Sequence, residues 1–597
     1  MLPSLLAHDP HSCARPTEAV VRHLTLDLAV DFSSRTLRGQ ATWQVETQSG
    51  ATDLWLDARD LHIEQVLLDG SVPTEFELGP ADAVLGQALR VALQPGTHSV
   101  TLHYRTSPAA AALQWLAPEQ TAGKVHPFMF TQSQAILART WIPCQDSPGV
   151  RFTYEARVTV PAHLLALMSA ENPQELAASG EYTFRMPQPI PSYLMALAVG
   201  DLRFEPLSSR TGIYAEPATL PAATHEFVDL ENMVAAAEDL YGPYRWERYD
   251  LLVLPPSFPF GGMENPRLTF VTPTILAGDR SLTSLVAHEL AHSWSGNLVT
   301  NATWNDFWLN EGFTVYFERR IMERLYGRPY ADMLQVLGQT GLHHTVAELG
   351  ADSPDTHLHL NLAGRDPDEG LNEIAYEKGN YLLLTLESVV GREKLDAFIT
   401  QYFSSHAFQS MDTASFLQYL RRELLSQVPG SEEKVQLDRW VNGPGVPAVG
   451  PAVASERFGR VEAALQTWRH GGGAAALDTQ EWSTHEWVHF LHGLPEHIEA
   501  DRLQDLDAAF GFTHSGNAEI LSAWFPHTIR AGYSPADEPL HQFLTRVGRR
   551  KFLTPLYKAL LATPGGAERA RTIYAAARPN YHSVATSTFD TLVGRDA

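Results

Sequence analysis

The segment SLVAHELAHSWSG, residues 284–296, constrains this chain most, because its His-Glu-x-x-His pattern can bind a metal only when the segment is helical. On a helix His288 and His292 lie one turn apart, so both imidazoles project from the same face. Their ring nitrogens are then a few ångströms apart, which suits zinc–nitrogen bonds of about 2.0–2.1 Å. Glu289 projects from the flank, where its carboxylate can reach a water molecule at the metal without being a ligand. The segment therefore predicts a helix that carries two zinc ligands and a general base.

A catalytic zinc ion takes three protein ligands and keeps one position open, so a third ligand must come from elsewhere in the chain. Glu311 stands nineteen residues beyond His292, in FWLNEGFTVYFERR, near the start of the next expected helix and beside Asn310 and Glu318. If the two helices pack side by side, the Glu311 carboxylate completes a His, His, Glu set. We therefore predict one Zn2+ per chain, bound by His288, His292 and Glu311.

A His-Glu-x-x-His match on its own also arises by chance on an amphipathic helix, and this chain has 25 histidines. The coincidence with Glu311 in an Asn-Glu-Gly-Phe context favours a real site, because two patterns must then match together. Other histidines occur close together, but these groups lack a convergent carboxylate and are expected at packing or surface positions. They are His343, His344, His357 and His359.

Hydrolysis of a peptide bond at such a site creates an oxyanion, which needs a hydrogen-bond donor besides the metal. A tyrosine phenol is suited to this task, since it stays protonated at neutral pH. The chain has 19 tyrosines, and chemistry alone does not choose among them. An exopeptidase also needs a carboxylate for the free α-ammonium of its substrate, and Glu264 in PFGGMENPR is a candidate. Gly261 and Gly262 let the backbone run close beside a substrate strand, although Gly-Gly-x-Glu-Asn also occurs as a plain turn.

The chain has 597 residues, more than one hydrophobic core organises, so two to four domains are expected. Polar and apolar residues alternate, with the period of half-buried strands, over Val20–Phe32, Leu37–Thr47, Ala88–Leu93 and His98–Thr106. Helical periodicity marks Glu226–Tyr241, Leu282–Trp294, Leu309–Tyr326, Tyr376–Val390, Phe458–Trp468, Trp487–Leu491, Arg502–Phe510, Ala518–Trp524 and Leu540–Leu561. The uncharged stretch VNGPGVPAVGPAVAS, residues 441–455, is typical of an interdomain linker. We predict a β-rich N-terminal domain over residues 1–203, a catalytic domain over 204–440 and an all-helical domain over 456–597.

The formal net charge of −25 argues against nucleic acid or an anionic membrane as a partner, because phosphate binding depends on clustered Lys and Arg. Only Cys13 and Cys144 occur, without the spacing of a thiolate zinc site, and two reduced thiols are expected. No apolar stretch approaches about 20 residues, and MLPSLLAHDPHSCARP lacks the basic start and unbroken apolar run of a signal peptide. A cytoplasmic protein is expected, or a periplasmic or secreted one if a leader has been removed.

Several motifs together resemble one family along nearly the whole chain. They include HLTLDLAVDF, RTLRGQATWQVE, FMFTQSQAILARTWIPCQDSPGVRFTYEA, PPSFPFGGMENP, VAHELAHSWSGNLVTNATWNDFWLNEGFTVYFERR, DPDEGLNEIAYEKG and GRRKFLTPLYKAL. The order GGMENP, HELAHSW and WLNEG is a highly specific signature. The sequence resembles the zinc aminopeptidases that include aminopeptidase N, and is most similar to the leukotriene A4 hydrolase branch. The resemblance implies an α+β multidomain fold with a saddle-like β domain, a thermolysin-like catalytic domain and a C-terminal helical domain of armadillo or HEAT-like pairs.

The resemblance also implies roles for individual residues. The zinc ligands and the general base Glu289 match those derived above, and Tyr376 in AYEKG matches the phenol that stabilises the oxyanion. Arg549 and Lys551 in GRRKF match basic residues that bind the C-terminal carboxylate of a peptide, whereas alone they would indicate a solvated basic run on a helix. Glu264 matches the residue that holds the amino group of the substrate, with Gln134 helping. The further residues expected to bind substrate are Gln132, Gly261, Gly262 and Met263.

Two positions depart from the family members that open an allylic epoxide. Those members have a tyrosine five residues before the catalytic one, where this chain has Leu371, and another just before the GGMEN segment, where it has Phe260. Asp368, which matches a carboxylate that directs water in the epoxide reaction, is present. The sequence therefore predicts an aminopeptidase that acts on short peptides, with no obligate protein partner evident. An epoxide hydrolase and a binding protein with an inactive site are the alternatives.

Overall fold

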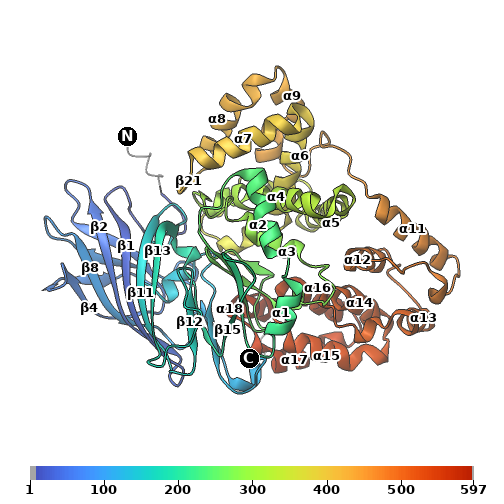
Figure 1. Cartoon of the computed structure of the whole chain (residues 1–597), viewed down its shortest axis with the longest axis horizontal. Helices are drawn as coiled ribbons and strands as arrows, with labels where there is room; N and C mark the ends of the chain where they lie inside the picture. The colour runs from blue at the N-terminus through green and yellow to red at the C-terminus, as the bar shows by residue number, and fades with distance from the viewer. Residues whose placement is uncertain (1–7, 595–597) are drawn as a thin grey trace.

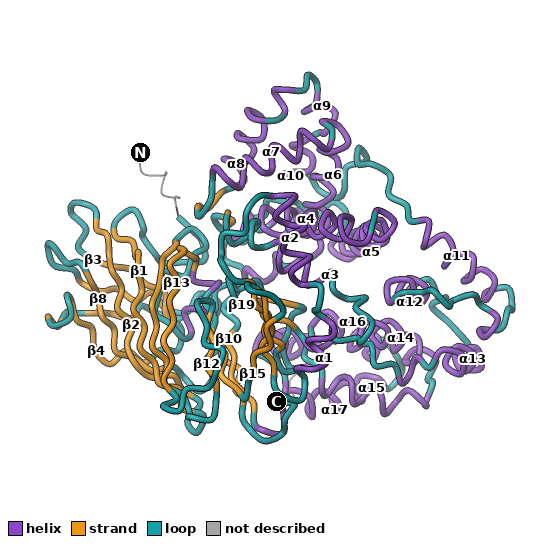
Figure 2. The backbone as a smooth tube through the Cα atoms, viewed as in Figure 1, coloured by secondary structure: helices purple, strands orange, loops and turns teal. Residues whose placement is uncertain are grey.

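The computed structural model describes residues 8–594; the expectation about a signal peptide also concerns residues 1–7, which lie outside the described residues. Strands dominate the chain as far as residue 215, and helices dominate it from residue 220 onward. Figure 1 shows three units in chain order, a strand unit, a mixed unit and a helical unit, and Figure 2 shows the same division by secondary structure. The expected fold class, β-rich, then mixed, then all-helical, is confirmed. The boundaries at residues 203, 440 and 455 stay predictions.

The strand unit contains β1 (Ala19–Asp31), β2 (Thr36–Thr47), β3 (Asp53–Ala58), β4 (His62–Leu68), β5 (Val72–Pro73), β6 (Phe76–Leu78), β7 (Gln87–Ala92), β8 (Ser99–Arg105), β9 (Leu113–Leu116), β10 (Phe128–Thr131), β11 (Arg151–Thr159), β12 (Leu165–Met168), β13 (Glu181–Pro191) and β14 (Leu197–Gly200). Its main sheet has the order β13-β11-β1-β2-β8-β4-β5, and smaller sheets run β3-β7-β6 and β12-β14-β10-β9. Buried and exposed side chains alternate along β1, as the sequence pattern predicts. The end of β10 leads directly into Gln132, which contacts the mixed unit.

The mixed unit is built on a sheet of β15 (Arg203–Pro206), β16 (Thr211–Ala215), β17 (Tyr249–Val253), β19 (Leu268–Val271) and the short edge strand β18 (Gly262–Met263). Its helices are α1 (Leu220–Glu226), α2 (Leu230–Tyr241), α3 (Ser284–Ala291), α4 (Trp308–Tyr326), α5 (Arg328–Leu349), α6 (Gly379–Val390), α7 (Arg392–Ser405), α8 (Thr413–Glu423), α9 (Ser431–Val435) and α10 (Leu437–Asn442). Two further strands, β20 (Val299–Asn301) and β21 (Gln409–Met411), form a separate parallel pair. The edge strand β18 packs beside α3, so the GGMEN segment borders the helix that carries the His-Glu-x-x-His pattern.

Helices α4 and α6 approach so closely that only glycine fits at their contact. A Cβ atom at Gly312 would stand 2.8 Å from the Cα of Gly379, and one at Gly379 would stand 2.7 Å from the Cα of Gly312. Gly312 follows Glu311, and Gly379 follows the π-helical turn η8 (Ile374–Lys378), which carries Tyr376. The glycine pair therefore brings the segments of Glu311 and Tyr376 together.

Gly312→Ala is expected to lower the free energy of unfolding by about 1–3 kcal/mol, because an added methyl group overpacks this helix contact. Thermal melting of the purified variant measures the change. Gly459→Ala is a matched control: a Cβ atom at Gly459 meets nothing within 4 Å, and helix propensity there predicts a small gain in stability. A melting temperature of the Gly312 variant equal to that of the control would contradict the close packing.

The helical unit contains α11 (Glu456–Arg469), α12 (Thr484–His492), α13 (Ala500–Phe510), α14 (Ala518–Ala531), α15 (Asp537–Arg546), α16 (Arg550–Leu561), α17 (Gly566–Ala577) and α18 (Ser583–Phe589). Helices α12, α14 and α16 pack side by side in one layer, and α15 packs on α17 in a second layer farther from the mixed unit. The first layer faces the mixed unit, since α12 contacts α5 and α14 contacts the short turn η4 (Pro273–Ile275).

The continuous helical pattern over Leu540–Leu561 is divided in the structure, which ends α15 at Arg546 and starts α16 at Arg550. The break occurs at Gly548, whose N–H donates to the carbonyl of Pro256 at 2.8 Å. A Cβ atom at Gly548 would stand 2.2 Å from the Ser257 carbonyl oxygen. The chain thus leaves the helix to dock on the mixed unit, a long-range contact that local periodicity does not report.

Three other expected helices also differ in extent. The pattern over Glu226–Tyr241 is interrupted between α1 and α2, and α3 covers only the middle of Leu282–Trp294, with His292 at its C-terminal cap. The pattern over Tyr376–Val390 begins in the π-helical turn η8 before α6. The predicted element types hold, and the differences concern where each helix ends.

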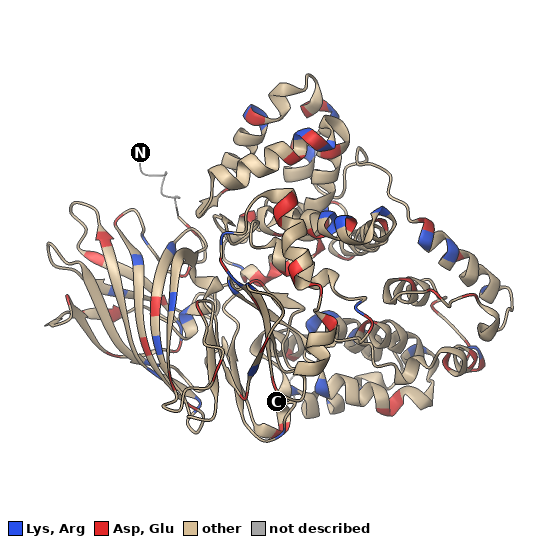
Figure 3. Cartoon of the chain, in the orientation of Figure 1, with Lys and Arg blue, Asp and Glu red and all other residues tan. Residues whose placement is uncertain are grey.

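Cys13 and Cys144 are unpaired thiols, as expected. Among the helices of residues 8–594, none combines the length and the apolar character that crossing a bilayer requires. Figure 3 shows Lys and Arg interspersed with Asp and Glu in each of the three units.

Candidate metal centre

His288, His292 and Glu311 converge in the mixed unit. One potential ligand atom from each of them lies within 4.8 Å of the others. The Glu311 Oε2 atom is 3.3 Å from His288 Nε2 and 3.6 Å from His292 Nε2. His288 lies within α3 and His292 caps it, while Glu311 belongs to the first turn of α4. The two helices pack against each other, so the structure brings the three residues together as the sequence predicts.

Each histidine is oriented through its other ring nitrogen. His292 Nδ1 lies 3.0 Å from the carbonyl oxygen of Ser295, and His288 Nδ1 lies 3.2 Å from the carboxylate of Glu318. Because these oxygens only accept hydrogen bonds, each Nδ1 carries a proton and each Nε2 is free to bind a metal. The buried Oε2 atom of Glu311 has no hydrogen-bond partner within residues 8–594. An unpaired carboxylate oxygen beside two imidazole nitrogens fits the donor set of zinc.

The electrostatics of the centre favour a cation. Burial lowers the pKa of His292 to about 4, so its imidazole is neutral, as a metal ligand must be. Burial also acts to lower the pKa of His288, but the carboxylates of Glu311 and Glu318 outweigh it and raise that pKa well above the ordinary value. The same negative field that attracts a proton to His288 attracts a divalent cation.

Glu289 is buried beside the centre, and burial raises its pKa to about 8. A Cβ atom at Gly262 would stand 2.3 Å from the Glu289 Oε1 atom and 2.4 Å from its Cδ. At Gly261 a Cβ atom would stand 2.4 Å from Leu285 Cδ1 and 2.8 Å from an Nη2 atom of Arg549. The two glycines therefore leave the space that the Glu289 and Arg549 side chains occupy. This is a second reason for glycine here, besides the close approach of a substrate that the sequence suggests.

Gly262→Ala is expected to lower kcat/KM by at least about tenfold, because a methyl group at this position must push the Glu289 carboxylate out of place. Zinc content is expected to stay at the wild-type level, since the three atoms nearest to a Cβ at Gly262 all belong to Glu289. Steady-state kinetics together with metal analysis measure both quantities. Full activity in this variant would show that the position of Glu289 is not critical.

Glu264 lies in the same confined space, since Glu264, Glu289 and His292 also have ligand atoms within 4.8 Å of one another. Its side chain is buried and its Oε1 atom has no hydrogen-bond partner among the described residues. Burial raises its pKa well above the ordinary value, and the Glu289 and Glu311 carboxylates raise it further. Asn297 Nδ2 donates to the Glu264 carbonyl at 2.7 Å and fixes the backbone here. A cationic group is therefore the natural partner for the unpaired Glu264 oxygen.

The strand unit adds Gln132 beside the GGMEN segment. Gln132 Nε2 donates to the Met263 sulfur at 3.2 Å, and its buried Oε1 atom has no partner within the described chain. Gln134 is buried two residues farther on. The free carbonyl oxygen of Gln132 can accept a hydrogen bond from an N–H group in the site.

Tyr376 lies beside His288 and Glu311, in the π-helical turn η8. Its ring stacks on that of His288, with centroids 6.1 Å apart and an interplanar angle of 12°, and contacts Phe307 edge-on. Burial raises the pKa of the Tyr376 phenol well above its ordinary value, and the Glu311 carboxylate beside it raises it further. The phenol therefore stays protonated and can donate a hydrogen bond.

Arg549 and Lys551 come from the start of α16 and meet a carboxylate that the sequence analysis does not single out. Arg549 Nη1 lies 3.3 Å from Glu519 Oε1, and Lys551 Nζ lies 3.2 Å from each oxygen of Glu519. Arg549 Nη1 also lies 3.4 Å from the Thr274 hydroxyl. These two basic residues are therefore part of an ion-pair cluster with Glu519, in which Arg549 is buried and Lys551 is exposed.

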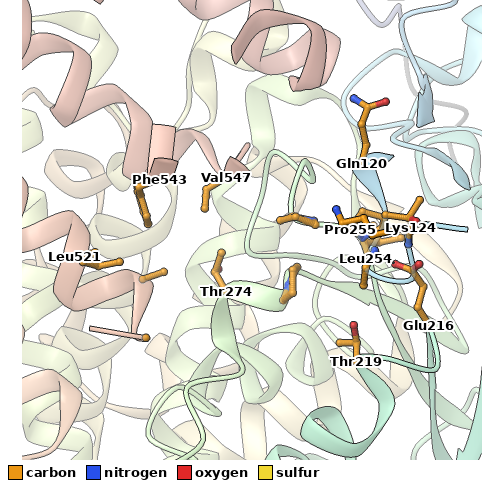
Figure 4. A pocket seen from close by; sticks show the side chains of 16 residues that line it. Gln120, Lys124, Glu216, Thr219, Leu254, Pro255, Thr274, Leu521, Phe543 and Val547 are labelled. Atoms are coloured by element: carbon orange, nitrogen blue, oxygen red, sulfur yellow. Dashed lines mark hydrogen bonds between the residues drawn. The ribbon is translucent and has the colours of Figure 1, made fainter. Parts of the chain in front are cut away.

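A cavity of about 400 Å³ lies where the three units meet, and Figure 4 shows its wall. Gln120 and Lys124 come from the strand unit, Glu216 from the mixed unit, and Leu521 and Phe543 from the helical unit. The metal ligands do not line this cavity. It adjoins the ion-pair cluster through its wall residue Thr274, but it is separate from the metal centre.

Asp368, Leu371 and Phe260 occupy the positions relevant to the alternative epoxide chemistry. Burial raises the pKa of Asp368 to about 7, and a backbone hydrogen bond involving Ala135 acts in the opposite direction. Leu371 is half-buried, and the guanidinium carbon of Arg550 lies 5.6 Å from the centre of the Phe260 ring. The Asp368 carboxyl group is therefore near Ala135, next to Gln134. Leu371 and Phe260 supply no hydroxyl group.

Comparison with known families accounts for all three units. Residues 20–194 match the Peptidase M1 N-terminal domain, residues 227–440 match the Peptidase family M1 domain, and residues 482–592 match the Leukotriene A4 hydrolase, C-terminal domain. The chain belongs to the M1 peptidase family. It is an enzyme of the zinc aminopeptidase family of hydrolases with the C-terminal domain of the leukotriene A4 hydrolase branch, which confirms the predicted resemblance.

Similar proteins span nearly the whole chain. Leukotriene A-4 hydrolase of Xenopus laevis is 40% identical, over 92% of this chain and 93% of that protein. Leucine aminopeptidase 2 of Yarrowia lipolytica is 35% identical, over 94% of this chain and 88% of that protein. The structure of yeast LTA4 hydrolase in complex with Bestatin matches with a TM-score of 0.90 at 30% identity and covers 100% of this chain and 98% of that chain. An M1 zinc metallopeptidase from Deinococcus radiodurans shares the fold of 75% of this chain, with a TM-score of 0.58 at 22% identity.

Sequence reasoning missed the residues that support the site from outside. Ser295 and Thr314 orient His292, Asn297 holds the backbone of Glu264, and Glu519 pairs with the basic residues of α16. Thr314 lies three residues after Glu311 on one helix face, a spacing that could have indicated it. No local signal exists for Glu519, because its partners are about thirty residues away in sequence.

Proposed function

We propose that this M1 peptidase is a zinc aminopeptidase that removes the N-terminal residue from short peptides. One observation carries the proposal: the carboxylates of Glu311, Glu289 and Glu264 converge on His292, and each has a buried oxygen without a hydrogen-bond partner among the described residues. Glu311 completes a zinc site, Glu289 is free to act as a base, and Glu264 is free to bind an ammonium group. Zinc, when bound, polarises the scissile carbonyl and lowers the pKa of water at the site.

The residues of the chain divide the remaining tasks. Glu289 takes the proton from the attacking water and passes it to the leaving amine. Glu264, assisted by Gln132 and Gln134, binds the free α-ammonium group, so that only one residue fits before the scissile bond. Tyr376 donates a hydrogen bond to the oxyanion.

The far end of the peptide is bound by Arg549 and Lys551, which carry the positive charge that suits a terminal carboxylate. Gly261, Gly262 and Met263 provide the strand edge along which the peptide backbone lies. A peptide held at both ends must be short, because Arg549 lies close to the GGMEN segment: a Cβ atom at Gly261 would stand 2.8 Å from its Nη2 atom.

A panel of aminoacyl 4-nitroanilides, assayed with and without a chelator, tests the proposal. We expect hydrolysis that stops when the metal is removed and returns when zinc is added back. N-acetylation of the substrate is expected to abolish cleavage, because the acetyl group removes the charge that Glu264 binds. Hydrolysis that survives chelation, or equal cleavage of free and acetylated substrates, would contradict the proposal.

An epoxide hydrolase of the leukotriene A4 hydrolase type is a second candidate, supported by the C-terminal domain match and by the position of Asp368 near Ala135. We infer that this activity is weak, because Leu371 offers no hydroxyl where epoxide-opening members have a tyrosine. Incubation with leukotriene A4 followed by product analysis tests it. Products identical to those of spontaneous hydrolysis would eliminate this candidate.

A further inference from the structure

The carboxylate of Glu519 lies between Arg549 and Lys551, the two cations proposed to bind the C-terminus of a peptide. Glu519 belongs to the first turn of α14, and its cationic partners stand at the start of α16, in the same helix layer. Lys551 Nζ contacts both oxygens of Glu519 at 3.2 Å, and Arg549 contacts one of them at 3.3 Å. A side-chain carboxylate therefore already makes the contacts that a terminal carboxylate would make.

The cluster can bind a second carboxylate, but its two cations do not provide one full positive charge in excess for each of the two carboxylates. Two cations and one anion leave a net charge of about +1, so a bound peptide C-terminus must share the cations with Glu519. The Arg549 side chain is 7% exposed and its buried Nε atom has no partner within residues 8–594, whereas the Lys551 side chain is 64% exposed. Lys551 can therefore turn toward a ligand, while Arg549 is held in place.

Glu519 is fixed as an anion in this position. Burial acts to raise its pKa, but Lys551 and Arg549 outweigh burial and lower the pKa below its ordinary value. The N-terminal end of α14 adds a favourable field for a negative charge, and Asn517 caps this helix by accepting a hydrogen bond from the Glu519 N–H. The competing carboxylate is thus a permanent part of the cluster.

We infer that Glu519 is a specificity-determining residue that competes with the C-terminal carboxylate of the substrate for Arg549 and Lys551. The inference rests on the proposed aminopeptidase function. When a peptide has a free C-terminus, Glu519 weakens its binding by holding part of the cationic charge. When a peptide has a neutral C-terminus, Glu519 satisfies the cations that would otherwise be left unpaired. The residue therefore reduces the preference of the enzyme for free-acid peptides over C-terminally blocked ones.

A positioning role for Glu519 predicts the opposite sign. If Glu519 served only to hold Arg549 and Lys551 in place, its removal would loosen the subsite and raise KM for free-acid peptides. If it competes, its removal releases charge to the substrate and lowers that KM. The direction of the change in KM for free-acid peptides therefore distinguishes the two roles.

The test compares tri-alanine with tri-alanine amide as substrates of wild-type enzyme and Glu519→Gln. For the variant we expect KM for tri-alanine to fall about three- to tenfold, the size expected for a partly exposed charge-assisted contact. KM for the amide and kcat for both substrates are expected to change less than about twofold. Glu538→Gln, at an exposed position of α15 in the same unit, is the matched control and should leave all four constants unchanged.

Binding without turnover provides an independent readout. Titration calorimetry measures the binding of tri-alanine and tri-alanine amide to the Glu289→Gln variant and to the double variant that also carries Glu519→Gln. The double variant should bind tri-alanine three- to tenfold more tightly, about the change expected in KM, and the amide with unchanged affinity. Glu519→Asp withdraws the carboxylate by one methylene and is expected to give a smaller gain in the same direction. Glu519→Asp keeps the negative charge at the start of α14 and replaces Glu519→Gln in the test if that variant does not fold.

A rise in KM for tri-alanine, or equal changes for acid and amide, would overturn the inference. These outcomes differ from failure of the proposed function, in which wild-type enzyme would hydrolyse neither peptide. If Glu519→Gln hydrolyses both peptides with the same ratio of KM values for acid and amide as wild type, the aminopeptidase function is retained and only the role of Glu519 is rejected.

Discussion

Glu289→Gln is expected to lower kcat by about 10²- to 10⁴-fold, the usual contribution of a general base, while zinc stays bound. The amide has nearly the size of the carboxyl group, so it fits the buried space beside Gly262, but it cannot accept a proton from water. Glu289 stands outside the proposed ligand set of His288, His292 and Glu311, but its carboxylate also lies close to Glu264 and His292, so zinc content must be measured beside activity. Steady-state kinetics with an aminoacyl nitroanilide and zinc analysis of the purified variant measure the two effects separately.

The control for this change is Glu433→Gln, which alters the charge by the same amount in α9, on an exposed face of the same unit. It should retain both zinc and turnover. Near-wild-type kcat in Glu289→Gln would reject Glu289 as the base. Loss of zinc together with loss of activity would instead place Glu289 among the metal ligands.

The fold and the family were within reach of the sequence, because both are encoded in local patterns and contiguous motifs. Alternation along Val20–Phe32 predicted the strand that forms β1, and the i,i+4 spacing of His288 and His292 required a helix. The position of Glu311 at the start of the next helix along the chain explains how its carboxylate reaches the two histidines. These inferences need only the period of a helix or strand and the short distance between neighbouring elements.

Contacts between distant segments were beyond such reasoning. Gly548 breaks the expected helix because it docks on Pro256 and Ser257, and no feature of Leu540–Leu561 encodes that partner. The contact matters for the site, because the break makes Arg549 the cap of α16. Glu519 escaped notice for the same reason. Such residues become visible only when the packing of the helical unit on the mixed unit is known.

The choice of Tyr376 among the tyrosines of the chain shows a different limit. Chemistry required a phenol without naming it, and the family resemblance supplied the position. The structure places this ring against His288 and near Glu311, in the middle of a π-helical turn. That turn is held by the contact between Gly312 and Gly379, which no single-sequence pattern indicates. The role of Tyr376 therefore remains a proposal that kinetics must test.

Tyr376→Phe is expected to lower kcat by about 10²- to 10³-fold with little change in KM, as does the loss of one oxyanion donor. The phenol forms its bond only as charge develops on the carbonyl oxygen, so substrate binding in the ground state is unaffected. The phenyl ring preserves the stacking on His288, and zinc content should equal that of wild type. Steady-state kinetics on a series of aminoacyl nitroanilides measure kcat and KM for each substrate.

Tyr381→Phe is the matched control for this prediction. Tyr381 lies in the next helix, α6, and its hydroxyl donates to the Pro451 carbonyl at 2.9 Å, away from the metal ligands. Removing that hydroxyl should change stability slightly and kcat by less than about twofold, since the bond is present equally in ground and transition states. If Tyr376→Phe raised KM alone, the hydroxyl would be a substrate-binding group. If it left both constants unchanged, the oxyanion donor would have to be another group near His288, because the phenyl ring that remains cannot donate a hydrogen bond.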